Sequence, residues 1–249
     1  ACGFIDRHQQ HPFFLYLPFN AVHNPMDPPE KYIAPFAPMK DEKRRKFAAM
    51  LTALDSGVGS ILGKLNEHDL TNNTLVIFIS DNGGPTAQTT SNNGPLRGFK
   101  TQVLEGGIRV PFMMQWPGHI RPDQTYSEPV ISLDILPTIV AAAGGELVAS
   151  DKCDGSDLVP YLALNDSKPH NALFWRQGEN FAIRSGKFKF VKQTGEPLAL
   201  YDLSQDIHED HNLIAQMPDK ANELQSVWNQ WNADNIDPLW ERRDRQPQR

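Results

Sequence analysis

The feature that most constrains the fold of this chain is a pair of nearly continuous apolar runs separated by one amphipathic helix. The first run is PFFLYLPF at 12–19, and the second is TLVIFIS at 74–80. Runs of this kind are typical of strands that are covered on both faces. Between them, apolar residues recur at three- and four-residue steps over 43–65, which indicates a helix weakened by Gly57 and Gly59. The order strand, helix, strand predicts a right-handed crossover in a parallel sheet.

The residues that follow predict one more strand and one more helix. Residues 110–116 form a third candidate strand. After it, Ser132 or Asp134 can cap a helix that stops at the glycine pair 144–145.

From about residue 170 the pattern changes to short alternating segments separated by turn residues, which indicates a small antiparallel sheet. A last helix over 218–231 is expected to carry its apolar residues on one face: Leu224, Val227, Trp228 and Trp231. The predicted fold class is therefore α/β. A largely parallel sheet sandwiched by helices spans residues 1–168, and a small antiparallel α+β subdomain spans 169–249.

Composition excludes several classes of protein. The chain has 249 residues, of which 39% are hydrophobic and 22% charged, so it can bury a sizeable core. Its net charge is -6 and its acidic and basic residues are interspersed, which argues against nucleic acid as a partner. No apolar run approaches the length that spans a membrane. The two cysteines, Cys2 and Cys153, have neither metal-ligand spacing nor the number that a disulfide framework needs.

Asp81 and Asn82 directly follow the second apolar run, in the sequence FISDNGG. Ligands of open parallel sheets lie beyond the carboxyl ends of the strands, and acid and amide oxygens suit a hard cation such as calcium or magnesium. Gly83 and Gly84 would let the backbone pass close to whatever is bound. The same four residues are also good turn material. Because two ligands are too few, the others must come from elsewhere in the chain or from an absent segment.

Two other loops carry matching chemistry. His23 lies at the start of a proline-rich loop, and Arg97 and Lys100 lie in the glycine-broken stretch GPLRGFK. Taken alone, each is more often an ordinary surface or loop residue. A cation, a histidine and a lysine that converge at one sheet edge would make a site for a tetrahedral oxyanion.

The segments FISDNGG, PLRGFK and EGGIRVP, in this order and spacing, resemble the second half of the type I sulfatases, the arylsulfatase-like family. The segments TALDSGVGSIL, SLDILPTIVAAAGG and LYDLSQDIHEDHNL resemble the same family, so the resemblance spans essentially the whole chain. It implies an alkaline phosphatase-like fold and the hydrolysis of a sulfate ester, on a small molecule or a glycan.

The resemblance also assigns roles to individual residues. It implies that Asp81 and Asn82 are ligands of a catalytic calcium, or of magnesium in its place. Lys100 would hold a sulfate oxygen and neutralise or protonate the leaving alcohol, and His23 would contact the sulfate ester. Because the family is often exported, a periplasmic or extracellular location is expected.

Sulfatases use a formylglycine nucleophile, which is made from the first residue of a Cys/Ser-x-Pro/Ala-x-Arg motif. Gly-Phe-Ile-Asp follows Cys2 and Asp-Gly-Ser-Asp follows Cys153, so neither cysteine fits. The paired aspartates that complete the family's metal site have no counterpart either. We therefore expect the chain to be the C-terminal portion of a sulfatase that needs a missing N-terminal segment, and to be inactive alone.

The sequence is also compatible with two alternatives. A phosphomonoester or phosphonate hydrolase of the same superfamily would use the same fold, and fold alone does not decide function. A catalytically silent fragment or binding module would lack the nucleophile altogether.

Overall fold

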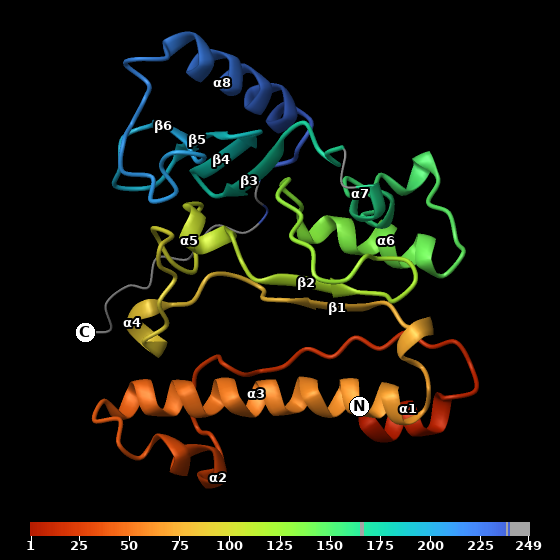
Figure 1. Cartoon of the computed structure of the whole chain (residues 1–249). Helices are drawn as coiled ribbons and strands as arrows, with labels where there is room; N and C mark the ends of the chain where they lie inside the picture. Colours follow the sequence, from red (N-terminus) through yellow and green to blue (C-terminus); the bar gives the residue numbers. More distant parts are fainter. Residues whose placement is uncertain (165–166, 238, 240–249) are drawn as a thin grey trace. The chain divides into compact units, whose positions relative to one another are not determined.

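The computed structural model describes residues 1–164, 167–237 and 239, so the end of the predicted subdomain at 240–249 lies outside the described residues. The chain divides into two compact units (Figure 1). The first comprises Ala1–Asn93 and Val110–Pro169, and the second comprises Gly94–Arg109 and His170–Arg249. The sequence placed the segment Gly94–Arg109 in its first predicted domain, whereas its contacts group it with the second unit.

The first unit consists of helices and a two-stranded sheet. Its helices are α1 (Cys2–His8), α2 (Glu30–Ile33), α3 (Glu42–Glu67), α4 (Thr86–Thr89), α6 (Ile135–Ala142) and α7 (Val159–Leu164). Its 3-10 turns are η1 (Ala34–Phe36), η2 (Thr71–Asn73), η3 (Ser132–Asp134) and η4 (Ala149–Asp151). Its strands are β1 (Val76–Ile79) and β2 (Phe112–Gln115). Among the described residues, no helix has both the length and the apolar character that crossing a membrane requires.

Helix α3 confirms the helix predicted over 43–65 and extends it slightly at both ends. The carboxylate of Asp41 caps its first turn by accepting a hydrogen bond from the N–H of Arg44 at 3.0 Å. Such a cap satisfies one of the backbone donors that the start of a helix leaves without an internal partner. The buried residues of the helix are Ala49, Met50 and Leu65.

Strands β1 and β2 confirm the strands predicted at 74–80 and 110–116, but they pair antiparallel. Val76 lies opposite Gln115, and Ile79 lies opposite Phe112. The parallel sheet expected from the sequence is not found in the described part of the chain. The predicted crossover required residues 12–19 as its first strand, and these residues form none.

Residues 12–19 are extended but unpaired, contrary to the prediction of a buried strand. Phe14 and Tyr16 are 70% and 76% exposed, Leu17 and Phe19 are exposed as well, and no residue of the run is buried. Pro12 and Pro18 have no N–H to donate to a ladder. No strand of the described residues is hydrogen-bonded to this run, and an apolar pattern cannot make a paired strand without a partner.

The helix predicted after residue 131 has the expected stop, but neither Ser132 nor Asp134 caps α6 with its side chain. The buried carboxylate of Asp134, not the hydroxyl of Ser132, accepts hydrogen bonds from the N–H groups of Ile131 and Ser156, both at 2.8 Å. At the other end Gly144 adopts a φ of 77°, the left-handed conformation that commonly ends a helix.

The second unit contains the antiparallel sheet that the sequence predicted after residue 170. Its strands are β3 (Leu173–Gln177), β4 (Asn180–Ser185), β5 (Phe188–Lys192) and β6 (Ala199–Asp202), and its helices are α5 (Glu105–Ile108) and α8 (Pro218–Ala233). The strands are hydrogen-bonded in chain order, and every pair is antiparallel.

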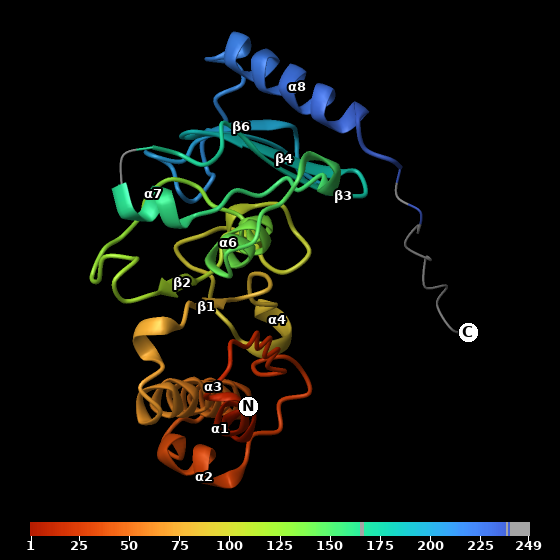
Figure 2. The ribbon, with the colours of Figure 1, turned by 90° about the vertical axis from the view of Figure 1, so that its right-hand side faces the viewer.

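Helix α8 lies across one face of this sheet, as Figures 1 and 2 show. Its residues Ala221 and Leu224 are buried there, and Trp231 stacks on Phe174 of β3 with ring centroids 4.8 Å apart. Val227 differs from the prediction because it is 38% exposed and lies outside this cluster. The buried sheet residues on this face are Ile183, Phe190 and Leu200.

The opposite face of the sheet is covered as well. Val103 and Leu104, from the segment Gly94–Arg109, form one buried cluster with sheet residues. The residues from the sheet and from the turn after β6 are Ala182, Val191, Ala199, Tyr201 and Leu203. This segment therefore packs into the core of the second unit.

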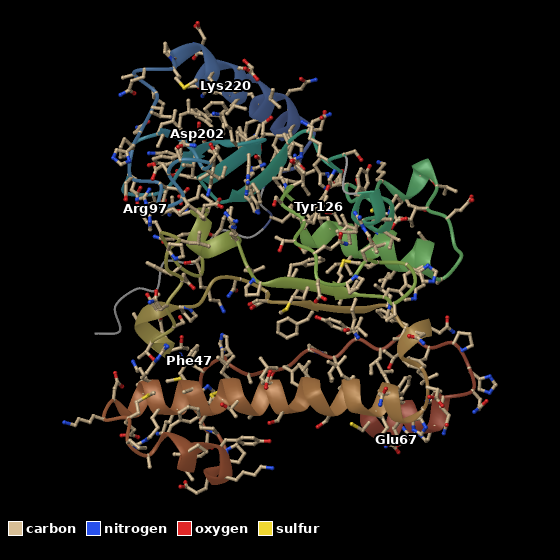
Figure 3. All side chains as sticks on the ribbon, viewed as in Figure 1. Phe47, Glu67, Arg97, Tyr126, Asp202 and Lys220 are labelled. Carbon is tan, nitrogen blue, oxygen red and sulfur yellow. The ribbon has the colours of Figure 1, made fainter. Side chains whose placement is uncertain are left out.

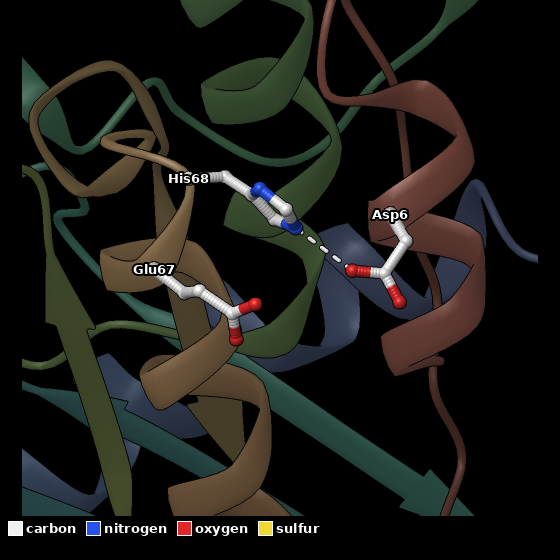
Figure 4. Close-up of side chains that lie close together, drawn as sticks. All are labelled: Asp6, Glu67 and His68. Carbon is white, nitrogen blue, oxygen red and sulfur yellow. Dashed lines mark hydrogen bonds and ion pairs between the residues drawn. The ribbon is translucent and has the colours of Figure 1, made fainter.

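In the first unit, an ion-pair cluster fastens helix α1 to the end of α3. Asp6 accepts a hydrogen bond from Nε2 of His68 at 2.7 Å (Figure 4). The same carboxylate oxygen lies 3.1 Å from Nζ of Lys64, which also lies 2.8 Å from Oε2 of Glu67. Beside the cluster, Ile5 of α1 is fully buried. The burial of Ile5 and this ion-pair cluster both attach α1 to the rest of the unit.

We predict that Asp6→Asn lowers the free energy of unfolding at neutral pH. Hydrogen bonds from His68 and Lys64 hold the pKa of Asp6 below its usual value. An acid whose pKa is lowered in the folded state stabilises the fold above its unfolded pKa, and this stabilisation is lost as pH falls through the folded pKa. In urea unfolding, the difference between Asp6→Asn and the parent chain should therefore be largest at neutral pH and shrink below a pH of about 4. A difference that does not depend on pH, or an equal loss from the exposed Asp55→Asn control on α3, would contradict this.

Candidate functional site

Asp81 and Asn82 lie immediately beyond the carboxyl end of β1. Asp81 is exposed, and its carboxylate makes no hydrogen bond or ion pair with the residues that the structure describes. The side-chain nitrogen of Asn82 donates to the carbonyl of Gly83 at 3.0 Å, a bond that does not use its Oδ1. One anionic and one neutral oxygen are the kind of donor that calcium and magnesium prefer. The pair therefore fits a hard cation in chemistry, but supplies only part of the six or more oxygens that calcium takes.

Asn93 closes the loop that begins with these two residues. Its side chain donates to the carbonyl of Gly84 at 2.9 Å and accepts from the N–H of Gly84 at 2.8 Å, as a neighbouring strand would. A Cβ on Gly84 would overlap the side chain of Ser91, so the close approach requires glycine.

The first turn of α3 holds the same loop from outside. Nζ of Lys43 donates to the carbonyl of Ala87 at 3.0 Å, and Arg44 donates to the carbonyl of Thr90 at 2.7 Å. Bonds from charged donors are stronger than those between neutral groups. The loop that carries Asp81 is therefore fixed at its far end.

His23 lies on an exposed loop of the first unit. Its backbone N–H donates to the carbonyl of Asn20 at 2.8 Å, and its Nδ1 lies 2.8 Å from the carbonyl of Asn24. Because a carbonyl oxygen only accepts, this contact assigns a proton to Nδ1, and the neutral ring then carries its acceptor on Nε2.

Lys100 lies in the second unit, in a four-residue turn from Phe99 to Gln102. The N–H of Gln102 donates to the carbonyl of Phe99 at 3.0 Å, and the side-chain oxygen of Gln102 accepts from the N–H of Phe99 at 3.1 Å. The residue after Lys100 is Thr101, whose φ of 77° is one that β-branched residues rarely adopt. Strain of this kind persists only where the surroundings over-determine the backbone.

Two glycines of α5 supply part of that constraint. The N–H of Gly106 donates to the carbonyl of Arg97 at 2.6 Å. A Cβ at either Gly106 or Gly107 would overlap backbone carbonyls of residues 97–102, so the backbones of helix and turn touch directly. Arg97 in turn (Figure 3) donates to Glu196 at 2.9 Å. The Gly106-Gly107 pair is therefore a packing requirement of the turn that carries Lys100.

The structure places the four predicted site residues on three loops. Asp81 and Asn82 are adjacent at the end of β1, and His23 belongs to the same unit. Lys100 belongs to the second unit. The catalytic and metal-binding roles expected for these residues remain predictions.

One other group gathers potential metal ligands among the described residues. The ligand atoms of Asp6, Glu67 and His68 lie within 4.8 Å of one another (Figure 4). The ammonium of Lys64, 3.1 Å from one carboxylate and 2.8 Å from the other, already supplies the positive charge there. The group is accounted for as an ion-pair cluster.

Sequence reasoning missed Asn93, which organises the loop after β1. An asparagine in a loop is a common closing residue because its amide both donates and accepts. That signal was present, but sequence alone does not say that the partner is Gly84, nine residues away.

Comparison with known proteins finds relatives of the whole described fold. The profile of the Sulfatase family matches residues 1–145. The profile described as N-sulphoglucosamine sulphohydrolase, C-terminal, matches residues 99–234. Arylsulfatase A of Bos taurus is 34% identical over 252 residues, which cover 89% of this chain and 48% of that protein. The chain thus spans about half the length of the curated relatives it matches.

Solved structures agree with these matches. That of Ps i-CgsB in complex with k-i-k-neocarrahexaose superposes with a TM-score of 0.90 and 32% identity, over 96% of this chain and 54% of the other. A phosphonate monoester hydrolase of Agrobacterium radiobacter superposes less closely, with a TM-score of 0.57 and 25% identity over 78% of this chain and 42% of the other. The chain therefore shares the fold of solved sulfatases, which is the alkaline phosphatase-like fold expected from the sequence.

We predict that this 249-residue chain binds calcium weakly, with a dissociation constant above about 1 mM, because Asp81 and Asn82 supply too few oxygens. Titration calorimetry of the chain should detect little heat. Micromolar binding that Asp81→Asn abolishes would mean that further ligands lie within these residues. Micromolar binding that Asp6→Asn abolishes instead would move the metal to the cluster between α1 and α3.

Proposed function

This chain belongs to the sulfatase family, and we propose that it supplies site residues of a sulfuric ester hydrolase that cleaves a sulfate monoester. The observation that carries the proposal is the pair of oxygen donors beyond β1. Asp81 has no protein partner among the described residues, and Asn82 makes a bond that does not use its Oδ1. Both lie within the residues that the Sulfatase profile matches.

Asp81 and Asn82 would hold a calcium ion, or magnesium in its place. The ion, when bound, supplies positive charge to the sulfate oxygens, which lowers the cost of the charge that develops during cleavage. The part played by this chain is to present one charged and one neutral oxygen from a loop that Asn93 and the start of α3 hold in place.

Lys100 would donate a hydrogen bond to a sulfate oxygen and stabilise or protonate the alcohol oxygen as the ester bond breaks. Its ammonium carries three donors and a full charge, which suits an oxygen that becomes anionic. His23 would donate a hydrogen bond to an ester oxygen from Nε2 when its ring is protonated on both nitrogens, since Nδ1 is directed at the carbonyl of Asn24. Neither side chain has to form a covalent bond in this scheme.

The nucleophile would be a formylglycine outside these residues, because neither Cys2 nor Cys153 lies in the required motif. We use "complete enzyme" for this chain joined to an N-terminal sulfatase segment that carries that motif. A sulfated glycan is the proposed substrate class. Its support is the 32% identity to Ps i-CgsB, whose structure was solved with a neocarrahexaose. A periplasmic or extracellular location is proposed with it.

A phosphonate or phosphomonoester hydrolase is the second candidate, supported by the likeness to the Agrobacterium radiobacter enzyme. A phosphate monoester carries nearly two negative charges at neutral pH and a sulfate monoester carries one. The two substrates would therefore need different amounts of positive charge around the same cation. The higher identity to sulfatases favours the sulfate ester. A silent binding module is the third candidate and predicts no turnover from the complete enzyme.

We predict that this chain alone hydrolyses nitrocatechol sulfate no faster than background, whereas the complete enzyme turns it over in a calcium-dependent manner. The assay compares both proteins with and without a chelator, and with nitrophenyl phosphate as the alternative substrate. Turnover by the isolated chain would refute the need for an external nucleophile. Preference for the phosphate ester would select the second candidate, and inactivity of the complete enzyme on both esters would select the third.

In the complete enzyme, Lys100→Ala should lower kcat about a hundredfold, because one preorganised contact to developing charge contributes about 3 kcal/mol. Thermal stability should change little, since the ammonium adds nothing to the hydrophobic core. Lys168→Ala removes an exposed lysine from another loop and is the matched control. Near-normal turnover by a folded, metal-loaded Lys100→Ala variant would show that this turn has no catalytic role.

A further inference from the structure

One lysine and two glutamates are buried where the segment Gly94–Arg109 meets the C-terminal sheet. Lys189 of β5 is 0% exposed, Glu209 is 1% exposed and Glu105, the first residue of α5, is 2% exposed. Ionised groups are almost never buried so completely unless they are paired, because removing them from water is costly. Glu105 and Glu209 lie in two of the segments that resemble sulfatases, EGGIRVP and LYDLSQDIHEDHNL, whereas Lys189 lies outside all of them.

Lys189 contacts both glutamates, and Glu209 also contacts the backbone of Glu105. Nζ of Lys189 lies 2.9 Å from a carboxylate oxygen of Glu105 and 2.9 Å from one of Glu209. The second oxygen of Glu209 accepts the backbone N–H of Glu105 at 2.8 Å. The ammonium and this direct hydrogen bond thus hold the start of α5 to the rest of the unit at two points. The other carboxylate oxygen of Glu105 lies 3.7 Å from Arg109 and 3.8 Å from Arg184.

Glu209 is itself held in a fixed position. The carboxylate of Asp206 accepts the N–H groups of Asp210 and His211 at 3.1 and 2.9 Å, which closes the loop around Glu209. Glu209 has a φ of 58°, a left-handed conformation that is uncommon for glutamate. Burial raises the pKa of Glu209, while the neighbouring Lys189 opposes this shift. Both the backbone and the carboxylate of Glu209 are therefore constrained to face α5.

Direct backbone contacts connect this buried set to the turn that carries Lys100. Glu105 is followed by Gly106 and Gly107, whose backbones lie directly against residues 97–102. A second bond, from the N–H of Val103 to the side chain of Gln193 at 3.1 Å, fixes the same segment on the sheet side. A displacement of the start of α5 would move the turn that carries Lys100.

We propose that Lys189 and Glu209 are positioning residues for Lys100, and this inference rests on the function proposed for Lys100. They act through Glu105 and the glycine pair, and neither would touch the substrate. The C-terminal sheet would thereby determine the placement of a catalytic side chain that lies about ninety residues earlier in the sequence, a separation of the kind that tertiary packing routinely bridges.

The first test follows hydrogen exchange in the 249-residue chain. Lys189→Met keeps the length of the side chain and removes its charge, leaving two buried carboxylates without their ammonium. Peptides covering 97–108 should exchange at least about tenfold faster, while peptides of β3 and β4 keep their protection. Lys187→Met is the matched control, because Lys187 lies on the same hairpin and pairs with Asp202 at the surface. Unchanged exchange over 97–108 would overturn the proposal.

Glu209→Gln covers the case in which Lys189→Met does not fold. Its amide oxygen can still accept the N–H of Glu105, but the charge opposite Lys189 is lost. Faster exchange confined to 97–108 supports the positioning role, and exchange that rises equally across the sheet contradicts it.

The second test is a double-mutant cycle in the complete enzyme. If Lys189 acts through Lys100, Lys189→Met should lower kcat about tenfold with KM nearly unchanged, and should lower it no further once Lys100→Ala is present. Two losses that multiply would show that Lys189 acts independently of Lys100 and would contradict the positioning role. If Lys100→Ala left turnover unchanged, the role proposed for Lys100 would fail, while the exchange experiment would still decide whether the buried set holds the turn.

Discussion

The buried ammonium of Lys189 is the contact on which the second unit depends. It lies 2.9 Å from each of two buried carboxylates, those of Glu105 and Glu209, where the sheet meets the segment Gly94–Arg109. Removing one partner from a buried ion pair costs about 3–5 kcal/mol, a large share of the stability of a typical domain. The apolar contacts of Val103 and Leu104 bury apolar surface, but the hydrophobic effect does not depend on the orientation of the groups. The charged contacts fix the orientation in which this segment packs.

In the first unit as well, the residues that hold a loop in place differ from the residues proposed to bind the metal. The side chain of Asn93 and the cations at the start of α3 hold the loop after β1 through hydrogen bonds to its backbone. Those bonds leave Asp81 without a protein partner in the described structure, at the position where an oxygen ligand is expected. In both loops, the residues proposed to act on substrate are presented by neighbours that would never contact it, which is how a preorganised site avoids reorganisation during reaction.

Local pattern was enough to predict the three longest helices of the described residues and the strands of both sheets. The spacing of apolar residues identified α3 and α8, and the alternating segments identified the four-stranded sheet. Pairing was harder to predict, because a strand needs a neighbour that its own sequence does not specify. Residues 12–19 have the composition of a buried strand and remain unpaired, and β1 takes an antiparallel partner where a parallel one was expected.

The candidate site could be predicted where its chemistry is contiguous in sequence. Asp81 and Asn82 were evident at the end of a strand, and Lys100 in a glycine-rich turn. Lys189 was not, because alternation in KFKFVK assigns it to a face that is normally solvated. That face is covered by residues from far earlier in the chain, and only the tertiary structure shows that a lysine there meets two carboxylates.

The most direct test of this account is a crystal structure of the complete enzyme with calcium and an uncleaved sulfate ester. Oxygens of Asp81 and Asn82 should lie about 2.3–2.6 Å from the ion, and Nζ of Lys100 should lie about 2.7–3.2 Å from an oxygen of the ester. A metal bound by other residues, or a Lys100 ammonium beyond hydrogen-bonding reach of the ester, would contradict this.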